Sequence, residues 1–538
     1  MTTAQSSSIP TPEEAARWTA GQIVELSRAH VALRHERDTL KHQLEWFKRQ
    51  LFGTKSEKRH PEPAPTQMFL GELPIPESAP VAPGKLVAAH TRQARATDFA
   101  KTEHDDGLFF DEQRVPVQTI ELPNPEVEGL LPEQYEVIGE KVSHRLAQRP
   151  GSYVVLKYVR PVIKRRDTET IHCAPAPVGV IEGSRADVSF IVGLLLDKFL
   201  WHLPLYRQHL RLTDAGIRVS RAWLTQLCAK ASALLEPIYA AQLASIRTAR
   251  VKAMDETPIK AGRAGPGKMK VGYFWPIYGE LDEVCFPFFE GRAHSNVETV
   301  LGLEPGKGSV LLSDGYGAYA AYAQKTGILH AQCWAHTRRE FFEAQAVEPA
   351  LGAEALERIG ALYAIEEHIR KKKLKLEAKR EYRLEHAKPV VEGFFAWVQH
   401  TLDNHGLLPA NPMTQALAYA RNRRVGLEVF LTDPDVPVDT NHLERALRPI
   451  PMGRKSWNFC WTELGAKHVG ILQSLLTTCR LHNVDPYDYL VDVLQRIDQH
   501  PAANVAQLTP RLWKAHFSQQ PLHSDLHQLG MGRETPLS

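Results

Sequence analysis

The order of strand and helix signals between residues 251 and 342 constrains the fold of this 538-residue chain more than any other feature. The first part holds three runs rich in branched or aromatic residues and separated by glycine or acidic turns, as in β-strands: 251–253, 270–278 and 284–289. The second part alternates between helix and strand signals at 297–303, 309–313, 319–324, 328–333 and 336–342. This order predicts a mixed α/β sheet.

Two acidic residues stand at the ends of strands in this predicted sheet. Asp255 follows the first strand and Asp314 ends the fourth. The order of elements is that of a ribonuclease-H-like sheet, in which the first and fourth strands are neighbours, so we expect the carboxylates to lie side by side. Mg²⁺ prefers carboxylate and water oxygens, and two such ions about 3.5–4 Å apart stabilise the attacking and leaving oxygens at a phosphate. A structural interpretation stays open, because Asp314-Gly315 is also a common turn dipeptide.

Glu444 is the third candidate, in the segment Asp439-Thr-Asn-His-Leu-Glu-Arg-Ala-Leu-Arg-Pro449. If Asn441 caps a helix here, a capping box explains Glu444 without catalysis, and an ion pair with Arg448 would also suffice. The next segment supplies two cations and an aromatic ring: Arg454, Lys455 and Trp457. Such groups beside carboxylates suit a backbone phosphate and an unstacked base.

The N-terminal third has a different character. From Ile23 to Leu51 apolar residues repeat in sevens, which predicts a short coiled coil; an amphipathic helix packed on its own chain is the alternative. Residues 61–83 carry seven prolines, which cannot continue a helix, so an extended linker is expected. An acidic stretch, 98–140, then precedes a basic one, 141–170, which is strand-like through Tyr153–Ile163.

The region from Asp187 to Ile246 is predicted to be helical. Gly216 is expected to end one helix and Ser220 to cap the next, which gives the tight turn of a helix-turn-helix. Arg221 and Trp223 would then stand near the start of a DNA-recognition helix. An ordinary helical hairpin explains the pattern equally well.

Several classes of protein are disfavoured. The longest apolar runs fall well short of the roughly 20 residues that a bilayer crossing needs. The N-terminus lacks the basic start and apolar region of a secretory signal. The six cysteines form no C-x-x-C pair, which fits a reducing compartment without disulfides. We therefore expect a cytoplasmic protein.

A set of short motifs, taken in order, relates this sequence to a known family. They run in order from about residue 23 to the C-terminal region: Leu51-Phe-Gly-Thr-Lys-Ser-Glu-Lys58, His202-Leu-Pro-Leu-Tyr-Arg207, Met254-Asp-Glu-Thr-Pro258, Ser313-Asp-Gly-Tyr316, Cys333-Trp-Ala-His-Thr-Arg-Arg339, and Asn441-x-x-Glu-Arg-Ala-Leu-Arg-Pro449 with Gly453-Arg-Lys455. With this set the chain resembles transposases of the insertion-sequence family numbered sixty-six, in the wider group that uses an Asp-Asp-Glu triad.

The resemblance implies an enzyme that binds the ends of its element and transfers DNA strands. Asp255, Asp314 and Glu444 match the metal-binding catalytic triad, for two Mg²⁺ or Mn²⁺ ions. Candidate contacts to the DNA backbone are Arg338, Arg339, Arg445, Arg448, Arg454 and Lys455. The implied partners are transposon-end and target DNA, further copies of this chain in at least a dimer, and small accessory proteins of the same element. A bacterial, nucleoid-associated location follows.

The chain also departs from the family. Relatives usually carry C-x-x-C pairs for zinc between the linker and the helical domain, whereas here Cys173 stands alone after His172. One thiolate and one imidazole cannot fill a tetrahedral zinc site, so we expect no structural zinc. His336, three residues after Cys333, is expected to belong to a helix start and to bind no metal.

The expected fold class is a multidomain α+β and α/β protein. Its predicted parts are a coiled-coil oligomerisation helix (1–60), a linker (61–115), a small β domain with a degenerate zinc module (116–178), a helical DNA-binding domain (179–248), a ribonuclease-H-like domain in two parts (249–342 and 413–480) split by a helical insertion (343–412), and a C-terminal helical region with a loose tail after Phe517 (481–538). Two other functions remain open: a catalytically inactive DNA-binding repressor or architectural protein, and a nuclease without joining activity.

Overall fold

The computed structural model describes residues 18–30, 34, 108–113, 115–149, 151–265, 268–404, 407–457, 460 and 462–527. The chain divides into two compact units, Met1–His104 and Asp105–Ser538. In the first unit, residues 20–30 form a helix, and Thr19 and Gln22 exchange hydrogen bonds between side chain and backbone at its start. Apart from Arg34, the rest of the predicted coiled coil lies outside the described residues, as does the predicted proline-rich linker.

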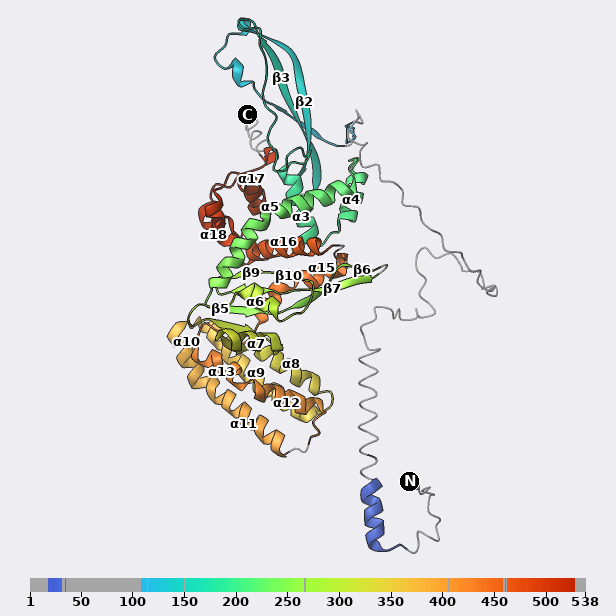
Figure 1. Ribbon diagram of the computed structural model, residues 1–538, viewed down its shortest axis with the longest axis vertical. Helices are drawn as coiled ribbons and strands as arrows, with labels where there is room; N and C mark the ends of the chain where they lie inside the picture. The colour runs from blue at the N-terminus through green and yellow to red at the C-terminus, as the bar shows by residue number, and fades with distance from the viewer. Residues whose placement is uncertain are drawn as a thin grey trace, which may run out of the picture. The chain divides into compact units, whose positions relative to one another are not determined.

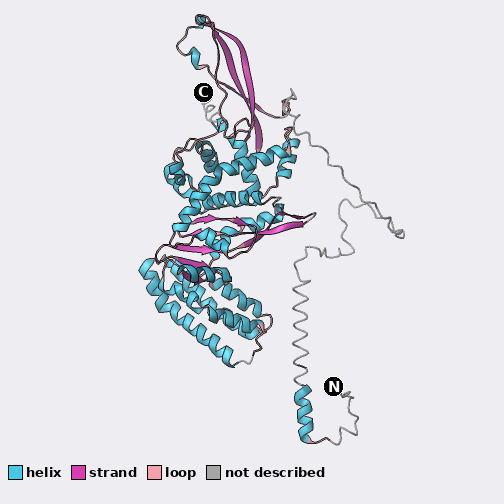
Figure 2. Ribbon diagram, in the orientation of Figure 1, coloured by secondary structure: helices cyan, strands magenta, loops and turns pink. Residues whose placement is uncertain are grey.

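A five-stranded sheet crosses the second unit (Figures 1 and 2). Its order is β12-β11-β5-β8-β9, with bounds β5 Val251–Met254, β8 Ile277–Gly279, β9 Glu283–Cys285, β11 Val310–Ser313 and β12 Leu329–Gln332. β5, β11 and β12 are parallel, whereas β8 is antiparallel to both β5 and β9. The prediction that the first and fourth strands are neighbours is therefore confirmed.

The single strand predicted at 270–278 is wrong, because the chain changes sheets within it. β7 (Lys268–Phe274) pairs with β6 (Thr257–Gly265) and β10 (Phe288–Phe289) in a separate three-stranded sheet. β8 begins only after Pro276, which has no N–H to donate to a ladder. The run 284–289 is likewise divided between β9 and β10. The sequence does not predict β6, because its glycine-rich second half has few branched residues.

Helices cover both faces of the five-stranded sheet. Alternate residues of a strand point to opposite faces. Met254 and Leu311 therefore face α6 (Ser295–Leu301) and α7 (Gly317–Thr326), with which they form a buried cluster. Ala253 and Leu312 belong to the larger core on the other face.

α16 (Glu463–Leu481) lies beside β9 and β10 (Figure 1). The approach is close, because a Cβ at Gly470 would come within 2.3 Å of the carbonyl oxygen of Phe286. Ser474 accepts a hydrogen bond from the Phe286 backbone N–H at 2.9 Å. These contacts join the C-terminal helices to the sheets.

The part before the five-stranded sheet combines a smaller sheet with three helices. Their bounds are β1 Val117–Glu121, β2 Tyr135–Arg149, β3 Ser152–Arg165, β4 Ile171–Cys173, α3 Val188–Phe199, α4 Leu205–Asp214 and α5 Arg221–Thr248. Both predicted helix ends are confirmed. Gly216 has a φ of 87°, and the Ser220 side chain accepts a hydrogen bond from the Trp223 backbone N–H at 3.1 Å.

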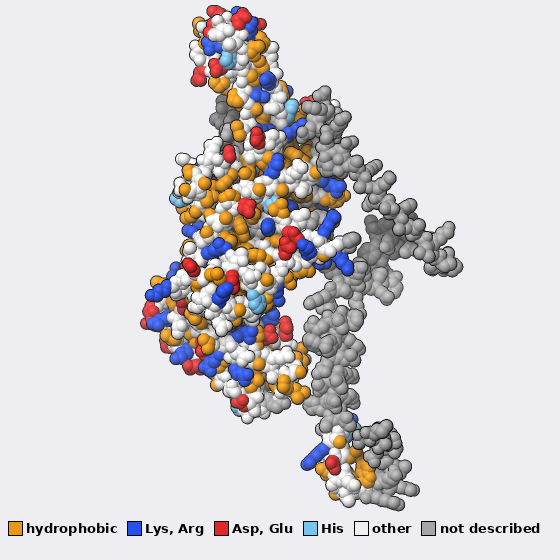
Figure 3. All heavy atoms as spheres, in the orientation of Figure 1, with side chains coloured by type: hydrophobic (Ala, Val, Ile, Leu, Met, Phe, Trp, Pro, Cys, Tyr) orange, Lys and Arg blue, Asp and Glu red, His pale blue; other side chains and the backbone are white. Residues whose placement is uncertain are grey.

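The segment predicted to be a helical insertion is helical. It comprises α9 (Pro349–Lys372), α10 (Leu376–Tyr382), a π-helical turn (Arg383–Ala387) and α11 (Lys388–Asn404), and is followed by α12 (Pro412–Asn422) and α13 (Arg424–Thr432). On the face shown in Figure 3, its Lys and Arg side chains are interspersed with Asp and Glu. Several of them pair within one helical turn, such as Arg358 with Glu354 and Lys371 with Glu367.

The C-terminal region is helical as predicted, with α17 (Pro486–Arg496), a 3₁₀ segment (Ala502–Leu508) and α18 (Pro510–His516). The expected loose tail after Phe517 is wrong for residues up to 527. The Tyr158 hydroxyl donates to Asp525 at 2.7 Å, and Leu526 is buried with Leu156 against the smaller sheet. Among the described helices, none is long and apolar enough to cross a membrane.

The ion pair between Arg383 and Glu366 should be essential to the insertion. The Arg383 guanidinium is fully buried, bonds Glu366 at 2.8 Å and donates to the carbonyls of Phe430 and Val436. Glu366→Ala leaves this charge unpaired, so we expect a loss of about 3–5 kcal/mol in thermal or denaturant unfolding. Glu377→Ala, which removes an exposed partner of Arg380, is the matched control and should change little. Equal effects of the two variants would contradict this account.

Candidate metal-binding site

The pairing of β5 with β11 places the two predicted aspartates. Leu312 stands beside Ala253 in the parallel register, and Asp255 and Asp314 each follow two residues later. Because side chains alternate along a strand, both aspartates leave the sheet on the face of Ala253 and Leu312. Trp334 of α8 (Trp334–Ala344) and Leu443 of α14 (Asn441–Leu447) belong to the same buried core as Ala253 and Leu312.

Asp255, Glu256 and Asp314 form a cluster that could hold a metal ion. One carboxylate oxygen from each lies within 4.8 Å of the others. Asp255 accepts a hydrogen bond from the Glu256 backbone N–H at 2.8 Å, and Asp314 accepts one from the Tyr316 backbone N–H at 2.9 Å. The structure thus brings together two of the three predicted carboxylates and adds Glu256, which the sequence interpretation missed.

Glu256 differs from the two aspartates because it already has partners. Its side chain is 4% exposed, pairs with Arg292 and accepts a hydrogen bond from the Tyr319 hydroxyl at 2.6 Å. Burial raises the pKa of Glu256, whereas these two bonds favour its charged form. No sequence signal separates Glu256 from an ordinary acid, since Arg292 and Tyr319 come from distant elements.

The electrostatics of Asp255 favour a bound cation. Burial, followed by the charges of Glu444 and Asp314, raises the pKa of Asp255 from 3.8 to about 8. No described Lys or Arg forms an ion pair with Asp255 to offset this. A divalent cation would relieve the repulsion, and an all-oxygen donor set is what Mg²⁺ or Mn²⁺ prefers, so the residues present fit such an ion.

Glu444 lies on α14, near the cluster but outside it. Its charge acts on Asp255, and its Oε1 is 3.8 Å from Nε2 of His336 on α8. The capping-box alternative is not realised. Thr440 is the N-cap and makes no side-chain cap bond, while Asn441 lies inside the helix and donates to Asp439.

His336 is a second residue that faces the carboxylates. Burial is the main cause that lowers its pKa, and the charges of Asp314 and Glu444 oppose that shift. Its Nδ1 is buried and has no hydrogen-bond partner among the described residues. His336 lies within the first turn of α8, as predicted.

The predicted DNA contacts fall into two groups. Four of them have exposed side chains on the two helices that flank the site: Arg338 and Arg339 on α8, and Arg445 and Arg448 at α14. Lys455 is also exposed, but on the next helix, α15 (Pro449–Trp457). The remaining candidates make contacts within the protein. Arg454 donates to the Pro258 carbonyl, Trp457 packs against the core, Trp223 stacks on Phe190, and Arg221 lies over Tyr206.

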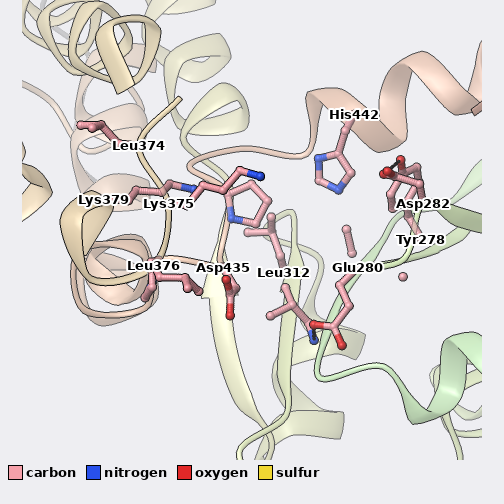
Figure 4. A pocket seen from close by; sticks show the side chains of 15 residues that line it. Tyr278, Glu280, Asp282, Leu312, Leu374, Lys375, Leu376, Lys379, Asp435 and His442 are labelled. Carbon is pink, nitrogen blue, oxygen red and sulfur yellow. Dashed lines mark hydrogen bonds between the residues drawn. The ribbon is translucent and has the colours of Figure 1, made fainter. Parts of the chain in front are cut away.

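A pocket of about 640 Å³ borders the same sheet (Figure 4). Leu312 and His442 line it, and its charged side chains have both signs: Glu280, Asp282, Asp435, Lys375 and Lys379. The His442 ring packs edge-on against Tyr278 at 4.7 Å between ring centroids. Three acids stand beside two lysines there, so the pocket carries charges of both signs, in contrast to the acidic cluster.

The fold and the site define a mixed α/β protein whose sheet presents an acidic cluster suited to divalent cations. The chain belongs to the transposase IS66 family, whose model matches residues 183–468. Residues 474–511 match the IS66 C-terminal element, and residues 39–102 match a family described as Transposase C of IS166 homeodomain. The family identifies the chain as an insertion-sequence transposase with a DNA-binding function.

Similar proteins occur in Sinorhizobium fredii. Uncharacterized protein y4qI is 30% identical over 392 residues, which covers 70% of this chain and 71% of the relative. Uncharacterized protein y4jD is 28% identical over 518 residues, or 92% of this chain and 96% of the relative. Uncharacterized protein y4hP is 29% identical over 404 residues, with 70% and 71% covered.

Asp255→Asn should stabilise the metal-free protein. The folded carboxyl keeps its proton up to a pH of about 8, whereas the unfolded one loses it near 3.8, so the free energy of unfolding falls as pH rises between these values. We expect the variant to melt roughly a few degrees above wild type at the alkaline end, with a smaller difference in acid. Added Mg²⁺ should raise the melting temperature of wild type more than that of the variant.

Asp498→Asn, at an exposed position, is the matched control. If wild type and Asp255→Asn melt at the same temperature in chelator at alkaline pH, the buried Asp255 carboxylate does not destabilise the metal-free protein.

Proposed function

We propose that this chain is a DNA transposase that binds the ends of its insertion sequence and catalyses metal-dependent strand cleavage and strand transfer. Its five-stranded sheet would be the core of a ribonuclease-H-like catalytic domain. The observation that carries the proposal is the adjacency of Asp255 and Asp314, with the charge of Glu444 close enough to raise the pKa of Asp255. Family membership supports the same reaction class.

Asp255, Asp314 and Glu444 are proposed to hold two Mg²⁺ or Mn²⁺ ions. Such ions, when bound, activate water and stabilise charge on the attacking and leaving oxygens at a phosphate. Glu256 fixes the loop after β5, because Arg292 and Tyr319 hold its carboxylate. His336 faces the site from α8 and offers a ring nitrogen to a phosphate oxygen or to Glu444. The burial of Asp255 excludes bulk water from one side of the site.

Binding of DNA is proposed to use the exposed cations of α8 and α14, with the turn between α4 and α5 as a separate recognition element. The predicted division into domains, the coiled-coil oligomer, the accessory proteins and the nucleoid location belong to the same proposal. Neutralised phosphates release counterions, so binding should weaken steeply with salt.

An inactive DNA-binding repressor is the second candidate. The observation that favours it is the position of Glu444 outside the cluster of three carboxylates. Binding can reorder an active site. If α14 moves toward Asp255 in the DNA-bound protein, Glu444 joins the cluster and its position no longer favours the inactive repressor.

Substitutions at the four acids should separate these functions. Asp255→Asn, Asp314→Asn and Glu444→Gln are expected to abolish strand transfer while binding of transposon ends persists. Glu256→Gln should reduce transfer by about 10- to 100-fold, because it acts by positioning. Asp498→Asn is the control. The measurement is joining of labelled end DNA to a plasmid in Mg²⁺, with binding followed by gel shift.

Each failure has a distinct meaning. Full transfer by Asp255→Asn would overturn the site. Cleaved ends that are never joined would identify a nuclease, and end binding by wild type without cleavage would identify the inactive DNA-binding protein.

A further inference from the structure

A pocket of about 510 Å³ lies between the C-terminal end of α3 and the helices α14, α15 and α16. Its volume is within the range of small-ligand sites. The residues that give it chemical character are Trp201, His202, Arg445, Arg448, Met452 and Arg480. Nothing in the carboxylate site depends on Trp201, His202 or Arg480.

The pocket is strongly cationic. Arg445, Arg448 and Arg480 line it, and no Asp or Glu does. None of these three guanidinium groups forms an ion pair or a hydrogen bond with a described residue, and all three are exposed. The pocket of Figure 4, by comparison, places three acids beside its two lysines. Three arginines without an ion-pair partner that line one hollow indicate an anionic ligand, and arginine forks match phosphate.

An aromatic side chain stands at the same pocket. Trp201 is 67% exposed, although large aromatic side chains usually bury most of their surface. Its backbone is fixed, because the N–H groups of Leu200 and Trp201 both donate to the Leu196 carbonyl, and Gln473 donates to the Phe199 carbonyl at 2.6 Å. Met452, 55% exposed, adds a second apolar surface. An exposed indole on a rigid loop suits stacking by a planar ring.

His202 adds an unused polar group. Its Nδ1 is buried without a hydrogen-bond partner among the described residues, and its φ is 57°, a left-handed conformation that costs energy for a residue with a side chain. Burial and the neighbouring charge of Arg480 lower the pKa of His202, which favours the neutral imidazole, a form that can both accept and donate a hydrogen bond.

We propose that this pocket binds one unstacked nucleotide of a DNA strand, with the phosphate held by Arg445, Arg448 and Arg480 and the base stacked on Trp201. The proposal rests on the proposed function and names the part of the DNA that is held beside the site. Glu444 precedes Arg445 directly and precedes Arg448 by four residues, or about 6 Å of helical rise. A strand that passes α14 beside Glu444 would therefore also pass the arginines that line the pocket.

Binding of two short single strands tests the proposal with the full chain. One is a labelled oligothymidylate, and the other has the same number of phosphates but abasic sugars. Base stacking on an aromatic side chain is worth about 1–3 kcal/mol, so wild type should prefer the base-bearing strand by roughly 5- to 150-fold. Trp201→Ala should erase this preference without weakening abasic binding, and Trp201→Phe should keep most of it.

Arg480→Ala should weaken both strands equally and reduce the slope of log affinity against log salt by about 0.7. Arg370→Ala, an exposed arginine of α9 that does not line the pocket, is the matched control. Thermal melting of each variant checks folding. A full preference in Trp201→Ala, or wild-type binding by Arg480→Ala, would overturn the proposal. Equal binding of the two strands by wild type would overturn it too, because the pocket would then be a plain anion site.

Failure of the pocket and failure of the proposed function give different results. A protein that transfers strands but shows no base preference through Trp201 lacks the nucleotide pocket. A protein with the base preference but without strand transfer keeps the pocket and loses the enzymatic assignment.

Discussion

The parallel pairing of β5 with β11 is the contact on which the candidate site depends. Its register sets Ala253 beside Leu312, so that Asp255 and Asp314 leave the sheet at one edge and on one face. The pairing joins segments far apart in sequence, and its stability comes from the two cores that it separates. Met254 and Leu311 anchor one face, while Ala253 and Leu312 anchor the other. Burial of these side chains is what holds two like charges together.

The carboxylates differ in the cations and hydrogen-bond donors that surround them, and this difference distinguishes their roles. Glu256 has Arg292 and Tyr319 as partners, whereas Asp255 has the Glu256 backbone N–H and no described cation. A buried charge without a counter-ion costs free energy, and proteins keep such groups where a ligand makes up the charge. Glu256 is therefore suited to hold the loop in place, and Asp255 to meet a cation that the chain does not itself supply.

Sequence patterns predicted the parts of the fold that depend on local chemistry. Strand signals, the Ser220 cap and the Gly216 turn depend on a few neighbouring residues, and the structure contains them. The patterns missed features set by distant contacts. β6 exists because β7 pairs with it, Asp525 is fixed by Tyr158, and Glu256 is distinguished by Arg292 and Tyr319. The helix that carries Glu444 was likewise predictable from local residues. The capping role predicted for Asn441 was not realised, because its side chain donates to Asp439 instead.

α14 connects the two sites because its residues point in different directions. Successive residues of a helix are turned by about 100°, so the side chains of Glu444 and Arg445 point in different directions. Glu444 approaches His336 and acts on Asp255, while Arg445 lines the cationic pocket with Arg480 of α16. A displacement of α14 toward the carboxylates would also move Arg445. The proposed nucleotide pocket and the proposed metal site therefore share one helix, and a shift of α14 would change both of them.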